Sequence, residues 1–123
     1  MSDQSAAREA VFDALGHPMR RRMLELLRAG PRPVGELARE LPIKRPAVSK
    51  HLRVLEGAGL VQHRSRGTRN LYVVAPEGLQ QAQRWLTGVW DAALSEFAVY
   101  VDGQAGRADG AVRASNDEGD RDD

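Results

Sequence analysis

The stretch RPAVSKHLRVLEG, residues 45–57, decides the fold of this chain. Pro46 suits the first turn of a helix, where its missing N–H costs no hydrogen bond, and the Gly57-Ala58-Gly59 sequence ends it. Because successive helical residues are rotated by about 100°, Val48, Leu52 and Leu55 fall on one side and must face a core. The pattern predicts a half-buried helix over residues 44–56.

The other side of this predicted helix is polar and cationic. The residues there and at its N-terminal end are Lys44, Arg45, Ser49, Lys50 and Arg53. A solvated helix usually mixes Glu with Lys, but the only acidic residue here is Glu56, near the far end. Side chains of this kind suit phosphates and the guanine edge in the DNA major groove. The helix is therefore a candidate DNA-reading element.

Three shorter helices are predicted before it. Apolar spacing indicates one over residues 5–15, a second from Pro18 to just before Gly30-Pro31, and a third over residues 34–41. The second has a buried stripe of Met19, Met23, Leu26 and Leu27, and the third has one of Val34, Leu37, Ala38 and Leu41. A four-residue connection, residues 42–45, leads from the third helix to the turn of helix opened by Pro46, which predicts a helix-turn-helix.

A β-hairpin is expected after the helix-turn-helix. Residues 60–65 and 71–75 are strand-like, and the connection over residues 66–70 contains Gly67 and Asn70. The hairpin, taken as a wing over residues 61–74, carries Arg64, Arg66 and Arg69 with no acid between them. Such a wing is suited to DNA backbone or minor groove. The alternative is a hairpin whose arginines are only solvated.

A long last helix is predicted over residues 76–100. Its apolar stripe is wider than a domain of this size can cover, so a second copy of the chain is the expected cover, in a two-fold dimer packed through the terminal helices, this one and the first. The predicted dimer-interface residues are Leu79, Leu86, Val89, Trp90, Ala93 and Phe97. The alternative is that these residues complete the core of one monomer.

The 123 residues fit one compact domain with attachments, and the predicted class is mainly α with a small β-hairpin. We expect a DNA-binding and dimerisation domain over residues 1–101 and a disordered acidic tail over residues 102–123. The net charge of the whole chain is close to zero, but the two segments carry charge of opposite sign. Residues 17–72 hold 13 Lys or Arg against 4 Glu, whereas residues 101–123 hold 3 basic against 7 acidic residues.

Several classes of protein and site are not supported. The chain has no cysteine, which excludes disulfides, thiolate metal sites and cysteine nucleophiles. The N-terminus lacks a signal-peptide pattern, and no apolar run is long enough to span a membrane, so we expect a cytoplasmic protein. No nucleophile, base or paired carboxylates form a recognisable motif, so we expect no enzyme and no cofactor.

The order of several segments resembles the ArsR family of bacterial and archaeal winged-helix repressors. The segments are ALGHPMRRRMLELL (14–27), VGELA (34–38), RPAVSKHLRVL (45–55) and GLV (59–61), and the resemblance covers roughly residues 7–100. It implies a homodimeric regulator, expected to be a repressor, that binds an imperfect palindrome in double-stranded DNA near promoters. It also implies base contacts from Lys44, Arg45, Ser49, Lys50 and Arg53, with wing contacts from Arg64, Arg66 and Arg69.

The sequence departs from the family pattern at two places. Lys44 stands where the family usually has a serine cap, which removes a hydroxyl acceptor from the helix start. Metal-responsive members carry Cys-x-Cys in the third helix, or His and carboxylate pairs on the last helix; neither is present here. His17, His51 and His63 stand on three separate elements without ligand spacing. The resemblance is therefore to the metal-independent branch, with no metal ligand predicted and no effector identified.

A second class of function also fits the expected fold. Winged helices can serve as protein-interaction modules without specific DNA binding. Such a module would show no salt-sensitive affinity for DNA and would hold a partner on the face of residues 44–56. The cationic character of that face favours DNA.

Overall fold

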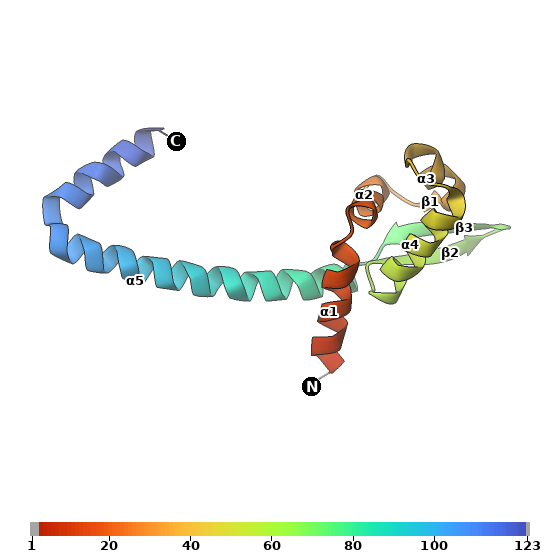
Figure 1. The fold of residues 1–123 in the computed structure, drawn as a ribbon, viewed down its shortest axis with the longest axis horizontal. Helices are drawn as coiled ribbons and strands as arrows, with labels where there is room; N and C mark the ends of the chain where they lie inside the picture. Colours follow the sequence, from red (N-terminus) through yellow and green to blue (C-terminus); the bar gives the residue numbers. More distant parts are fainter. Residues whose placement is uncertain (1–2, 123) are drawn as a thin grey trace. The chain divides into compact units, whose positions relative to one another are not determined.

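A computed structural model describes residues 3–122 of the chain, and the side chains of residues 3–104 (Figure 1). The chain divides into two units, Met1–Arg84 and Trp85–Asp123. The elements are, in order, α1 (Asp3–Leu15), α2 (Pro18–Leu27), β1 (Arg32–Pro33), α3 (Val34–Glu40), α4 (Arg45–Gly57), β2 (Val61–Arg66), β3 (Arg69–Val74) and α5 (Pro76–Asp122).

The predicted helices, helix-turn-helix and hairpin are all present, which confirms a mainly α fold with a small sheet. Helix α5 contains the predicted helix over residues 76–100 and extends beyond it to Asp122. The tail predicted over residues 102–123 falls mostly on residues 105–123, whose side chains lie outside those described. That tail, and the domain boundary at residue 101, stay predictions.

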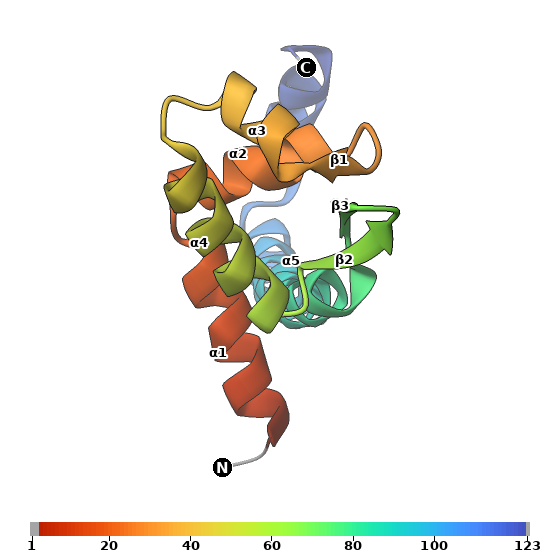
Figure 2. The ribbon, with the colours of Figure 1, turned by 90° about the vertical axis from the view of Figure 1, so that its right-hand side faces the viewer.

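The core of the first unit is built around one side of α4. Val48, Leu52 and Leu55 are fully buried, as the spacing of the apolar residues predicts. They pack with buried residues of the other helices and the sheet: Val11, Ala14, Met23, Leu24, Leu27, Leu37, Leu41, Leu60 and Val61. Figure 2 shows α2, α3 and α4 grouped beside the sheet. This packing fixes which side of α4 remains outside.

The sheet has three antiparallel strands in the order β1-β3-β2. The sequence missed β1, because the prolines around Arg32 read as a break. Pro33 lacks a donor and is tolerated because β1 is an edge strand. The hairpin connection is also shorter than predicted, since Arg66 pairs with Arg69 and leaves only Gly67 and Thr68 between the strands. Gly67 has a φ of 64°, which two-residue hairpin loops require.

The start of α5 lies against the turn between α4 and β2. The Gly78 N–H donates to the Gly59 carbonyl oxygen at 2.8 Å. A Cβ atom at residue 78 would lie 2.8 Å from the Ala58 carbonyl oxygen and 2.9 Å from the carbonyl carbon and oxygen of Gly59. Only a glycine at residue 78 allows this approach.

Gly78→Ala should therefore destabilise the protein, because the added methyl group meets backbone that cannot rotate away. We expect a loss of about 1–3 kcal/mol in the free energy of unfolding, the usual cost of overpacking, measured by urea denaturation. Gly57→Ala is the matched control, since no atom lies within 4 Å of its Cβ position. A Gly78→Ala protein that unfolds at the wild-type urea midpoint would contradict this packing.

Candidate nucleic-acid interface

The outer side of α4 presents the predicted DNA-reading side chains. Lys44, Arg45, Lys50 and Arg53 are exposed, and Ser49 is half-buried. Lys44 is the N-cap residue, and its side chain makes no capping hydrogen bond, as expected from the lost serine. The first-turn N–H groups and the nearby cationic side chains therefore present positive charge together at this end of the helix.

The three wing arginines lie on one face of the hairpin. Arg66 is directly opposite Arg69, and Arg64 is opposite Leu71, so these side chains share a face. The other face carries Val61, which is buried, and its partner Val74. Like charges placed opposite each other in a hairpin are destabilising by themselves. An anionic partner would offset this repulsion.

The wing is tied to the end of α4 by a side-chain bridge. The Glu56 carboxylate lies 2.6 Å from Nδ1 of His63 on β2, and the His63 ring lies 5.6 Å from the ring of Tyr72 on β3. Burial raises the pKa of Tyr72, and the neighbouring Glu56 carboxylate raises it further. The single acid of α4 is thus used to orient the wing, which the sequence did not reveal.

Two arginines of α2 hold the end of α1. Arg20 donates from Nε to the Ala14 carbonyl oxygen at 2.8 Å and from Nη2 to the Asp13 carbonyl oxygen at 3.1 Å. Arg21 donates from Nη1 to the Leu15 carbonyl oxygen at 2.6 Å. These carbonyls belong to the last turn of α1, where intrahelical donors run out, and that of Asp13 also accepts from the Gly16 N–H at 3.2 Å. Part of the basic excess of residues 17–72 therefore stabilises the fold.

His51 of α4 contacts this anchor. Its Nδ1 lies 3.3 Å from Nη1 of Arg20, and its ring lies edge-on to the His17 ring with 4.6 Å between centroids. An arginine can only donate, so the Nδ1 of His51 accepts and the ring proton of neutral His51 sits on Nε2. Burial lowers the pKa of His51, and the positive charges of His17, Arg20 and Lys50 lower it further.

The sequence analysis placed His17 and His51 on separate elements, and the structure shows that their rings are in contact. His17 also caps α2, since its Nδ1 accepts from the Met19 N–H at 3.2 Å.

Among the described residues, no group of three or more His, Cys, Asp or Glu side chains is arranged to hold a metal ion. The metal-independent assignment remains a prediction.

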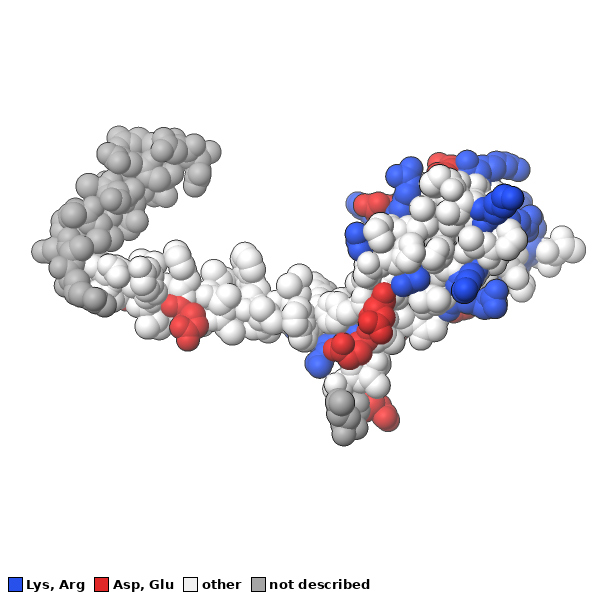
Figure 3. Space-filling model, viewed as in Figure 1, with Lys and Arg blue, Asp and Glu red and all other residues white. Residues whose placement is uncertain are grey.

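Basic side chains gather over the helix-turn-helix and wing in the space-filling view (Figure 3). Two of the four glutamates in residues 17–72 are paired, Glu40 with Arg32 and Glu56 with His63. On α4 and the wing, exposed cations outnumber acidic side chains, as a polyanion-binding surface requires.

A second surface lies on α5. In the single chain the large apolar side chains of the predicted dimer face are exposed, with Leu86 at 60%, Trp90 at 61% and Phe97 at 63%. Val89 and Leu79 are 47% and 40% exposed, and Ala93 is also exposed. Ala82, another member of the predicted stripe, instead packs against the core. Within the described residues, no helix combines the length and apolar character of a membrane span.

The fold and the basic surface together define a winged helix-turn-helix domain of the DNA-binding class. A family model described as a helix-turn-helix domain matches residues 15–64. The chain is 44% identical over 96 residues to the HTH-type transcriptional regulator Rv2034 of Mycobacterium tuberculosis, covering 78% of this chain and 90% of that protein.

Two further comparisons agree. Transcriptional repressor SdpR of Bacillus subtilis is 32% identical over 76 residues, or 62% of this chain and 84% of SdpR. The solution structure of the homodimeric winged helix-turn-helix DNA-binding domain of Mb0332 from Mycobacterium bovis, a possible ArsR-family regulator, matches with a TM-score of 0.58 and 30% identity. It covers 74% of this chain and 88% of that one. This chain belongs to the ArsR family of DNA-binding transcriptional regulators.

The His51 environment predicts a loss of stability on acidification. Because folding lowers the pKa of His51 below its ordinary value near 6.5, the unfolded chain binds the proton more tightly. The contribution of neutral His51 is fully present above that pH and is lost as the pH falls below it. Urea unfolding at a series of pH values should show this decline, and His51→Gln should reduce it. An identical pH dependence in both proteins would contradict the assignment.

Proposed function

We propose that the protein represses transcription as a homodimer that binds an imperfect palindromic operator. Residues 44–56, which include α4, enter the major groove, and the wing over residues 61–74 contacts the flanking backbone or minor groove. The base-contacting residues are Lys44, Arg45, Ser49, Lys50 and Arg53, and the wing contacts come from Arg64, Arg66 and Arg69. The repressor name of one relative supports the direction of regulation.

The observation that carries this proposal is the outer side of α4. Lys50 and Arg53 are exposed there, while the single acid of the helix is held by His63. An exposed helix side that carries several cations and one half-buried acid attracts a polyanion such as DNA. Of the two functions that the fold supports, DNA binding uses this feature and a general protein-interaction surface does not require it.

The apolar face of α5 supports the homodimer. Two copies packed through this face would be related by a two-fold axis, and each would present one α4. A two-fold protein matches two half-sites of opposite orientation, separated by about one turn of DNA. The palindromic operator thus follows from dimerisation through α5.

The remaining assignments follow from this role. The family is bacterial and archaeal, and in such cells the chromosome lies in the cytoplasm. We therefore place this DNA-binding regulator in the cytoplasm. The proposed mechanism contains no catalytic step, metal or cofactor.

Substitutions on α4 should lower affinity and sequence discrimination together. Lys50→Ala or Arg53→Ala should cost about 1–3 kcal/mol at the operator if the side chain reads a base, and less on unrelated DNA. Fluorescence anisotropy with a duplex from the protein's own upstream region measures both. Arg28→Ala, an exposed arginine outside α4 and the wing, is the control.

Substitution on the wing should act differently. Arg66→Ala should weaken binding to all duplexes alike and reduce the slope of log K against log salt by about 0.9, the value for one phosphate contact. If the wild-type protein shows no salt-sensitive DNA affinity at moderate salt, the proposal fails and the protein-interaction alternative takes its place.

The dimer is tested separately by solution mass. The wild-type chain should sediment with the mass of two chains, and Trp90→Glu should shift it toward one chain by placing a charge in the apolar interface. Ser95→Glu introduces the same charge on the opposite side of α5 and should leave the dimer intact. Equal masses for the two variants would contradict the proposed interface.

A further inference from the structure

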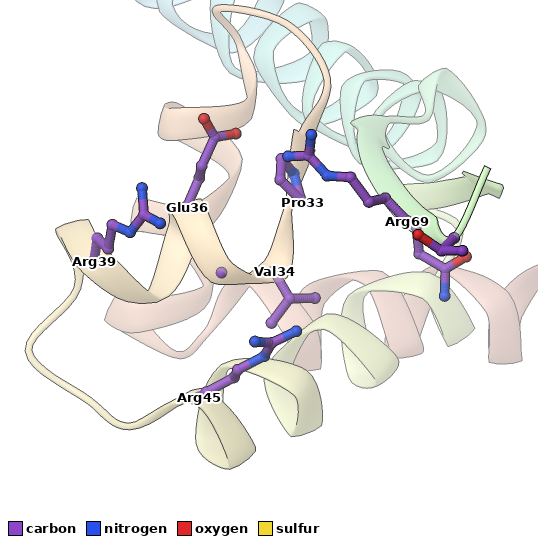
Figure 4. A pocket seen from close by; sticks show the side chains of 9 residues that line it. Pro33, Val34, Glu36, Arg39, Arg45 and Arg69 are labelled. Atoms are coloured by element: carbon purple, nitrogen blue, oxygen red, sulfur yellow. The ribbon is translucent and has the colours of Figure 1, made fainter. Parts of the chain in front are cut away.

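A cavity of about 340 Å³ lies where α3, α4 and the wing tip meet. It is lined by Gly35, Glu36 and Arg39 of α3, by Arg45 of α4, and by Thr68, Arg69 and Asn70 at the wing tip. Figure 4 shows Arg45 reaching toward Val34 from α4 and Arg69 reaching toward Pro33 from the wing. The volume is that of a small-ligand site.

Arginines from three separate elements line this cavity: Arg39 of α3, Arg45 of α4 and Arg69 of the wing. In the described part of the chain, Arg39, Arg45 and Arg69 make no ion pair and no side-chain hydrogen bond, in contrast to Arg20, Arg21 and Arg32. Glu36 is the only acid in the lining, and Figure 4 shows its carboxylate pointing away from Arg45. The lining therefore carries an excess of two positive charges.

The other lining groups leave room and supply donors. Gly35 has no side chain, and a Cβ there would lie 3.9 Å from Nη1 of Arg45. The carbonyl oxygen of the Asn70 side chain lies 3.2 Å from the Ser65 hydroxyl, which donates to it. The hydroxyl of Thr68 is a further donor in the lining.

We propose that this cavity binds a phosphate group through Arg39, Arg45 and Arg69. Guanidinium groups present pairs of N–H donors that match phosphate oxygens, and three of them around one opening offset the charge of a phosphate. The phosphate belongs either to the DNA backbone or to a free phosphorylated molecule. If the phosphate belongs to DNA, the inference rests on the proposed function. Arg39 of α3 is then an additional contact to the DNA backbone, placed between the contacts of α4 and those of the wing.

Arg39 is the informative position, because it lies outside both α4 and the wing. In the DNA arm of the test, the affinity of the full chain for a duplex of unrelated sequence is measured over a range of salt concentrations. Arg39→Gln should reduce the slope of log K against log salt by up to about 0.9. Arg28→Gln removes the same charge from the end of α2, away from the cavity lining, and should reduce the slope much less.

The second arm uses inorganic phosphate as the probe. Binding to the folded state raises the melting temperature of the protein. The melting temperature is compared in sodium phosphate and sodium chloride at matched ionic strength and pH. If the cavity takes free phosphate, the wild-type and Arg28→Gln proteins melt higher in phosphate, and Arg39→Gln does not.

Either result supports the site and identifies its source of phosphate. A lower salt slope in Arg39→Gln identifies the DNA backbone, and a phosphate-dependent melting temperature that Arg39→Gln loses identifies a free ligand. The site is overturned if Arg39→Gln matches Arg28→Gln in both arms. If the wild-type chain binds no duplex at all, the proposed function fails. The melting temperatures in phosphate and chloride then decide alone whether the cavity binds phosphate.

Discussion

Burial of Val48, Leu52 and Leu55 on one side of α4 is the constraint on which the rest of the structure depends. These side chains contribute to a core shared by α1, α2, α3 and the sheet. Each fully buried aliphatic side chain contributes about 1.5–3 kcal/mol, so rotating α4 about its axis would be prohibitively costly. Lys50 and Arg53 are therefore held outside by the same packing that stabilises the domain.

The distribution of charge follows from this arrangement. Arg20 and Arg21 bind the carbonyl groups that end α1, and Arg32 pairs with Glu40. The Glu56 carboxylate contacts Nδ1 of His63, and this contact links the recognition helix to the wing. The cations without a protein partner then include those of α4, the wing and the cavity between them. A nearly neutral chain thus has a strongly basic surface because its basic residues are concentrated in residues 17–72 and its acidic residues in residues 101–123.

The sequence predicted features that depend on local spacing. The periodicity of residues 45–57 located α4 and its buried side, and Gly67 located the hairpin turn. Features that join distant residues could not be predicted in this way. Strand β1 exists only through its pairing with β3, and the contact of His17 with His51 spans 34 positions of the printed sequence. Gly78 reads as an ordinary helix residue until Gly59 is placed beside it.

Binding-site selection from a random duplex library, using the full chain, tests the central claim most directly. We expect enrichment of an imperfect palindrome whose half-sites lie about one turn of DNA apart, because each copy of the dimer presents one α4. Recovery of a single unrepeated half-site would contradict the dimer through α5. Absence of any enriched sequence would contradict base reading by α4.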